Sequence, residues 1–162
     1  MNSKNQGFTL IEALIYLALF AVIIGGISMV AYALVESTGS SQTRISIQEE
    51  AGFLLGKLDW ALTGAQTITV TASTLTVNKY NFGGSNPLIF DLNAGKVRLK
   101  TASAAAVNLN NDDITVSVLS FTDIPAAAGK PQGVTASFTV QKPSPRGEVI
   151  SQSFVTTKYL RQ

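Results

Sequence analysis

An uncharged apolar run dominates the start of the chain. Between Ala13 and Val35 no side chain carries a charge, and a helix of that length rises about 34 Å, enough to cross the hydrocarbon core of a membrane. A mostly polar heptapeptide, MNSKNQG, precedes the run, and Glu12 is the single carboxylate at its head. The pattern predicts a leader over residues 1–7 and a transmembrane helix over residues 8–36.

The helical pattern continues as an amphipathic extension over residues 37–65. Apolar residues recur there at helical spacing, which predicts one buried face. These residues are Ala51, Leu54, Leu55, Leu58 and Leu62. The residues expected on the opposite face are Glu49, Glu50, Lys57 and Asp59. An amphipathic helix on any core would show the same pattern.

Residues 66–162 consist of short alternating or β-branched stretches separated by turns. Such stretches predict strands, and the loops between them suit antiparallel pairing. The expected strands are residues 67–70, 74–77, 88–92, 96–99, 114–121, 134–140 and 149–159. A helix followed by strands predicts an α+β fold, in which the long N-terminal helix packs on a small antiparallel β-sheet domain.

The segment from Gly7 to Glu12, GFTLIE, carries the most specific signal in the chain. With the polar leader and the apolar helix around it, this segment resembles the prepilin signature of type IV pilins and pseudopilins. The resemblance implies that a prepilin peptidase cuts between Gly7 and Phe8 and then methylates the new amino terminus of Phe8. It also implies that Thr9 and Glu12 serve assembly. Beyond about the first 36 residues the resemblance is only architectural.

A carboxylate at the head of an apolar span calls for a physical reason. Near the centre of a bilayer it costs about 2.5–3.5 kcal/mol, and less near the interface. A new ammonium on Phe8 and the Glu12 carboxylate of a neighbouring subunit are opposite charges in a low-dielectric setting, so their pairing would offset desolvation. Head-to-tail contacts of this kind give an open filament. The alternative places Glu12 at the headgroup level, where its charge costs little.

Two other interpretations of the N-terminus explain less of its sequence. A secretory signal peptide fits poorly, because such a signal has an apolar core about half as long as this run, followed by a small-residue cleavage site, whereas here a polar leader precedes the run. A plain membrane anchor explains the length but leaves Gly7, Thr9 and Glu12 as coincidence. Lys4 precedes the span and the next basic residue is Arg44, so we expect the leader in the cytoplasm and the domain outside.

Composition offers little for catalysis. The chain has no His and no Cys, which removes the common nucleophile pairs and zinc ligands, so we expect no enzyme, no cofactor and no metal site. An acidic set could offer oxygen atoms to calcium, but its spacing matches no calcium loop and an Asn/Asp turn needs no metal. This set is Asn110, Asn111, Asp112, Asp113 and Asp123. The net charge is +2 with scattered cations, so we expect no nucleic-acid partner.

These observations predict a structural subunit of a type IV pilus-like or type II secretion pseudopilus filament, with a minor pilin or minor pseudopilin favoured. The absence of cysteine departs from the disulfide loop of many major pilins. The implied partners are a prepilin peptidase, other pilin or pseudopilin subunits, an inner-membrane assembly platform and membrane lipid. The expected location is the cytoplasmic membrane, followed by a filament on the cell surface or in the periplasm.

Two alternatives remain open. One is a membrane-anchored extracytoplasmic binding domain that never polymerises. The other is a DNA-uptake or adhesion pilus component, which would need a basic or aromatic face that the scattered cations do not reveal. Two segments are candidates for partner recognition, the terminal stretch Gln152–Arg161 and the loop Lys142–Gly147, because exposed edges and loops often form contacts.

Overall fold

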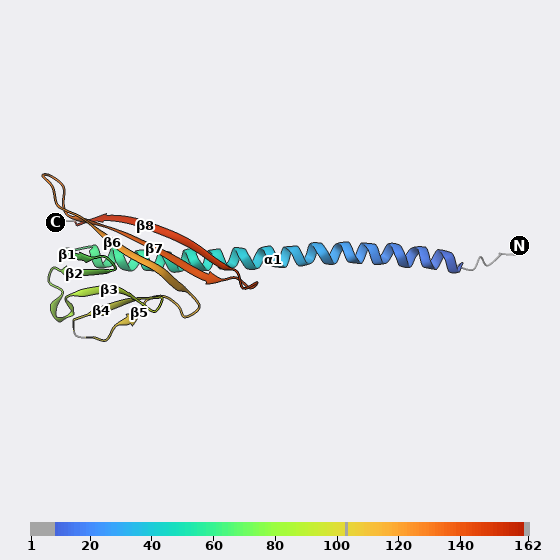
Figure 1. Cartoon of the computed structure of the whole chain (residues 1–162), viewed down its shortest axis with the longest axis horizontal. Coiled ribbons are helices and arrows are strands. Elements are labelled where there is room, and N and C mark those ends of the chain that lie inside the picture. The colour runs from blue at the N-terminus through green and yellow to red at the C-terminus, as the bar shows by residue number, and fades with distance from the viewer. Residues whose placement is uncertain (1–8, 103, 161–162) are drawn as a thin grey trace, which may run out of the picture. The chain divides into compact units, whose positions relative to one another are not determined.

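The computed structural model describes residues 9–102 and 104–160, and the chain divides into two compact units, residues 1–41 and 42–162. A single helix, α1 (Leu10–Leu62), runs through the first unit into the second (Figure 1). It is continuous across the glycines that the sequence places in it. It ends where Thr63 and Gly64 form a turn, with Gly64 at a φ of 71°. The single long N-terminal helix of the predicted fold is thus confirmed.

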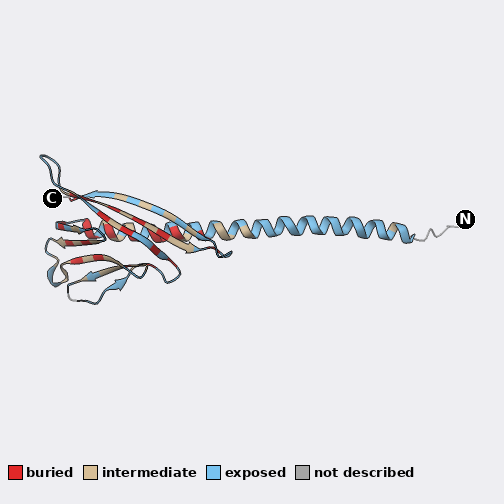
Figure 2. Ribbon diagram, viewed as in Figure 1, coloured by how far each residue is buried: buried red, intermediate tan, exposed pale blue. Residues whose placement is uncertain are grey.

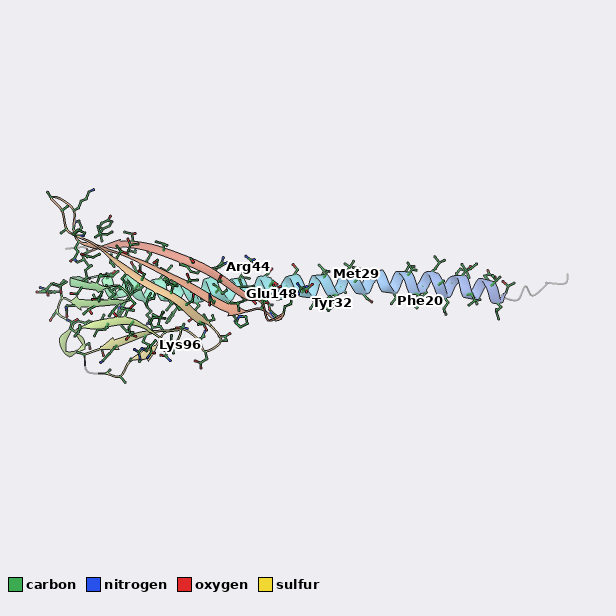
Figure 3. All side chains as sticks on the ribbon, viewed as in Figure 1. Phe20, Met29, Tyr32, Arg44, Lys96 and Glu148 are labelled. Carbon is green, nitrogen blue, oxygen red and sulfur yellow. The ribbon has the colours of Figure 1, made fainter. Side chains whose placement is uncertain are left out.

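In the first unit, α1 leaves its apolar side chains bare. No described residue before Thr43 is buried, as Figure 2 shows. Phe20, Met29 and Tyr32 are 63%, 78% and 73% exposed, and Figure 3 shows them projecting from the helix. By length and composition, α1 contains a segment apolar enough to cross a membrane. Side chains of this kind need lipid or other protein around them, because exposed apolar surface is costly in water.

In the second unit, the described residues form two antiparallel sheets. The first sheet has the strand order β1-β2-β3-β4-β5 and the second has the order β6-β7-β8. The strands of the first sheet are β1 (Ala65–Thr71), β2 (Thr74–Lys79), β3 (Leu88–Asn93), β4 (Lys96–Thr101) and β5 (Val107–Asn108). Those of the second are β6 (Thr115–Ile124), β7 (Gly133–Pro143) and β8 (Val149–Tyr159). A short 3₁₀ turn, η1 (Gly83–Ser85), precedes β3.

Each of the seven predicted strands corresponds to an observed one, and the α+β, pilin-like architecture is confirmed. The predicted set lacked β5, whose two residues are too few to show an alternating pattern. The turn between β3 and β4 places Ala94 and Gly95 at φ values of 48° and 76°. A Cβ on Gly95 would lie 2.5 Å from Cγ2 of Thr115, so the chain needs glycine there. The Gly95 carbonyl accepts a hydrogen bond from the Val116 backbone N–H at 2.9 Å, which ties this hairpin to β6.

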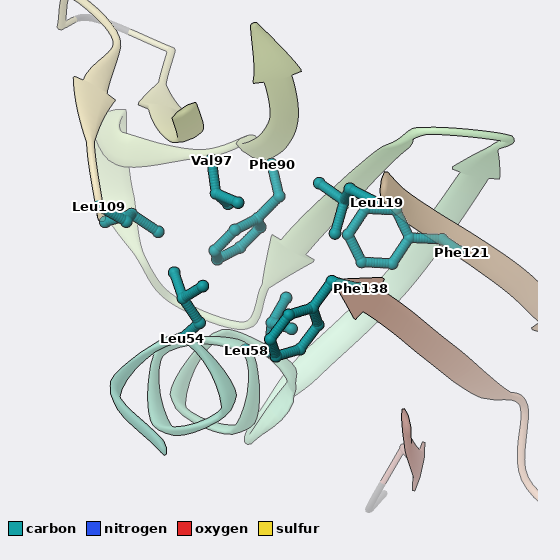
Figure 4. Close-up of a pocket in the computed structure, with 8 residues that line it drawn as sticks. All are labelled: Leu54, Leu58, Phe90, Val97, Leu109, Leu119, Phe121 and Phe138. Atoms are coloured by element: carbon teal, nitrogen blue, oxygen red, sulfur yellow. The ribbon is translucent and has the colours of Figure 1, made fainter. Parts of the chain in front are cut away.

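The core lies between the second half of α1 and both sheets. As predicted, Ala51, Leu54, Leu58 and Leu62 are buried, whereas Leu55 is only partly buried against the core. A close-up of the core shows side chains from α1 and from both sheets converging (Figure 4). The cavity that they enclose measures only about 10 Å³, which is barely enough for one water molecule. Close packing therefore holds the unit together without any disulfide.

One residue of the predicted polar face of α1 lies on the buried side of the helix instead. Glu50 was expected on the outside, but it is only 7% exposed, so that expectation is wrong. Its two carboxylate oxygens accept hydrogen bonds from the backbone N–H and the side-chain amide of Asn111, at 3.1 and 3.0 Å. These bonds compensate the carboxylate for the water it loses. Helical periodicity does not register such a long-range partner.

Candidate functional site

The start of α1 holds two of the predicted site residues, Thr9 and Glu12. Thr9 stands directly before the helix, and its Oγ1 accepts a hydrogen bond from the Glu12 backbone N–H at 3.4 Å. Its carbonyl accepts from the N–H groups of Glu12 and Ala13 at 3.1 and 3.2 Å. Thr-x-x-Glu is the spacing of a capping box, in which the first residue satisfies unpaired N–H groups of the first turn. Thr9 and Glu12 therefore also serve to start the helix, a signal that was present in the sequence and was missed.

Glu12 is half-buried in the first turn of α1, and Thr9 is exposed. A carboxylate is favoured at this end of a helix because the N-terminal N–H groups carry partial positive charge. The other two predicted residues, Gly7 and Phe8, lie outside the described residues. The geometry thus supports an ordered helix start beside the proposed cut.

The Asn/Asp segment before β6 forms hydrogen bonds and ion pairs that fix the loop between β5 and β6. Asn110 is buried, and its side chain bonds the backbone of Val97, Gly95 and Ile114. Asp112 pairs with Lys96 at 3.3 Å and Asp113 with Lys142 at 2.7 Å. Asp123 lies apart from them and accepts a hydrogen bond from Gln132. Over residues 9–102 and 104–160 no group of three or more acidic, His or Cys side chains gathers as a metal site would require.

The Asp113–Lys142 pair makes a pH-dependent contribution to stability. The hydrogen bond from Lys142 holds the pKa of the Asp113 carboxyl below its ordinary value. A lowered carboxyl pKa stabilises the fold above about pH 4, and this contribution is lost as the pH falls through the lower pKa of the folded state. Asp113 is 61% exposed, so we expect Asp113→Asn to cost less than about 1 kcal/mol at pH 7.

The measurement is urea unfolding of the two proteins between neutral and acidic pH. The difference in unfolding free energy between wild type and Asp113→Asn should shrink toward zero below about pH 4. Asp112→Asn is the matched control, because Asp112 is fully exposed and its contact with Lys96 is longer. A difference that does not change with pH would contradict this account.

The two segments proposed for partner recognition are mostly exposed, with a few contacts to the rest of the chain. Strand β8 is an edge strand of the second sheet. Its Lys158 forms an ion pair with Asp59 of α1, and Tyr159 is half-exposed. In the other segment, Lys142 at the end of β7 is paired with Asp113, and Ser144 in the loop that follows is buried. Arg161 lies outside the described residues.

Sequence reasoning missed a cluster that we call the aromatic-lysine face: Phe53, Lys57, Trp60, Lys79 and Phe82. Phe53, Lys57 and Trp60 follow one another at spacings of four and three residues, so they share one side of α1. Lys79 ends β2, and Phe82 comes from the turn after it. The helical spacing was readable in the sequence, but the approach of Lys79 and Phe82 depends on the fold.

The fold defines an α+β protein of pilin-like architecture, with an apolar helix before a β-rich domain. A family described as the prokaryotic N-terminal methylation motif matches residues 2–28. This match supports a type IV pilin-like protein, made as a precursor of the pilin or pseudopilin type. No curated protein and no solved structure matches the chain significantly.

Proposed function

We propose that this chain is a non-enzymatic structural subunit of a type IV pilus-like or type II secretion pseudopilus filament. Within such a filament it would be a minor pilin or minor pseudopilin. The observation that carries the proposal is the methylation motif of residues 2–28. The bare apolar side chains of α1 add support, because a filament core supplies the apolar surroundings that the membrane supplies before assembly. The absence of cysteine favours a minor subunit over a major pilin.

In this proposal a prepilin peptidase cuts between Gly7 and Phe8 and methylates Phe8. The Glu12 carboxylate then pairs with the amino terminus of a neighbouring subunit, which sets the position of each subunit along the filament. Other pilin or pseudopilin subunits and an inner-membrane platform are the partners. Before assembly, the chain lies in the cytoplasmic membrane with its β-rich domain outside.

The experiment that tests processing is intact-mass analysis of the full chain from cells with and without a prepilin peptidase. We expect a mature chain that begins at a methylated Phe8 only when the peptidase is present, and Gly7→Ala should block the cut. Gly26→Ala is the matched control, since a Cβ there meets open space within the chain. An uncut chain in both strains would overturn the proposal and favour an anchored binding domain.

A second arm of the same experiment tests assembly. Glu12→Gln keeps the size of the side chain and the backbone bonds to Thr9, but it removes the charge. We expect normal cutting and at least a tenfold fall in the amount of this subunit found in sheared filaments or cross-linked assemblies. Glu49→Gln, on an exposed part of α1, should leave both unchanged. Normal assembly of Glu12→Gln would contradict the role of Glu12 in pairing.

A further inference from the structure

The aromatic-lysine face alternates rings and ammonium groups in space. The Lys57 Nζ lies 5.3 Å from the ring centre of Phe53 and 6.0 Å from that of Trp60. The Lys79 Nζ lies 4.5 Å from the ring centre of Trp60 and 5.4 Å from that of Phe82. Each ammonium group is within reach of a cation–π interaction with two rings. The result is a continuous series from Phe53 through Trp60 to Phe82.

The two lysines of this face, like Lys100 and Lys130, differ from three other lysines of the same unit in having no acidic partner among the described residues. Lys96, Lys142 and Lys158 each form an ion pair with an aspartate. Among the described residues, Lys57 and Lys79 form no ion pair, and the Lys79 ammonium group donates a hydrogen bond to the Trp60 carbonyl at 2.8 Å. The face itself contains no acidic residue. Its positive charge is therefore open to an external anion.

The rings of this face are accessible. Phe53 is 47% exposed and Trp60 is 44% exposed. A shallow hollow lies between them, lined also by Gly56 and Lys57. A Cβ on Gly56 would meet nothing within 4 Å, although glycine inside a water-exposed helix costs about 1 kcal/mol relative to alanine. The missing side chain leaves room for a flat group to approach the helix between the two rings.

Exposed rings interleaved with cations that form no ion pair fit one class of ligand better than others. Single-stranded nucleic acid offers planar bases that stack on aromatic rings and phosphates that bind lysine. Duplex DNA hides its bases within the stack, and an anionic polysaccharide has no planar base to place on a ring. The scattered cations of the sequence predicted no nucleic-acid partner, but that reasoning could not foresee that the fold brings two of them onto three rings.

We propose that the aromatic-lysine face is a binding site for single-stranded nucleic acid, with bases stacking on Phe53 and Trp60 and phosphates bound by Lys57 and Lys79. The site lies wholly within residues 42–162. It does not depend on polymerisation, so it stands or falls separately from the proposed filament role.

The chain supplies its own reporter, because Trp60 is its only tryptophan. The experiment titrates oligothymidylate into the full chain in uncharged detergent micelles and follows Trp60 fluorescence. We expect saturable quenching that weakens as salt rises. Phe53→Ala should lower the affinity about five- to hundredfold through lost stacking. Lys57→Gln should lower it and reduce the slope of log affinity against log salt by about 0.7.

Lys100→Gln is the matched control, because Lys100 is exposed on β4 and lies outside the face. It should bind as the wild type does. Circular dichroism checks that each variant remains folded. The absence of quenching would overturn the proposal. So would equal affinity for heparin or for anionic lipid vesicles, or unchanged affinity in both Phe53→Ala and Lys57→Gln.

Discussion

Phe138→Ala is expected to lower the free energy of unfolding of the β-rich unit by about 3–5 kcal/mol, the range for removing a buried aromatic side chain. Phe138 is 2% exposed in the middle of β7. Its ring stacks on Phe154 of β8 with ring centres 5.6 Å apart. It also faces Leu58 of α1 in the core (Figure 4). Its removal would leave a cavity where the helix and the second sheet meet.

The measurement is urea unfolding of the full chain in detergent micelles, followed by the circular dichroism of the strands. Phe53→Ala is the matched control, because Phe53 is half-exposed on the other side of α1. That control should change the unfolding free energy by less than about 1 kcal/mol, as surface substitutions do. If both variants lost the same stability, burial of Phe138 would not be the cause.

Much of this fold was predictable because its signals are local. The apolar run gave the helix, and alternation with turn residues placed all the longer strands. The helix face of Leu54 and Leu58 followed from periodicity alone, since these residues repeat at the spacing of a helix. A local pattern could not predict contacts between residues that are far apart in the sequence. Glu50 is an example, because its carboxylate is buried against Asn111 far along the chain.

The two candidate sites also differ in how far local sequence patterns predict them. Thr9 and Glu12 sit in a contiguous motif, so sequence could select them, and the structure adds their local hydrogen bond. The sequence did not predict the complete aromatic-lysine face. Trp60 and Lys79 are separated by a complete strand and meet only when β2 packs beside α1. Lysines that look scattered in sequence can therefore converge in space, and sequence charge counts do not detect it.

Asn110→Ala is expected to lower the free energy of unfolding by about 3 kcal/mol, although it removes only a small polar side chain. Asn110 is 4% exposed. Its Oδ1 accepts from the Val97 N–H at 2.8 Å, and its Nδ2 donates to the carbonyls of Ile114 at 2.7 Å and Gly95 at 3.2 Å. Alanine would leave the buried Val97 donor without this partner, at a cost of about 1–3 kcal/mol when no water replaces it. It would also remove one hydrogen bond from each of the two carbonyls, which keep their bonds from Val116 and Lys96.

Amide hydrogen exchange at Val97, read together with urea unfolding, checks this expectation. The Val97 N–H should exchange faster in Asn110→Ala than in the wild type by more than the loss of global stability explains. Asn110→Asp keeps the acceptor but places a carboxylate against two carbonyls, so it should be at least as destabilising. Asn108→Ala, in exposed β5, should leave both measurements near wild type. A loss below about 1 kcal/mol in Asn110→Ala would mean that water takes over these bonds, and that the loop before β6 is held by Glu50 and Asn111 instead.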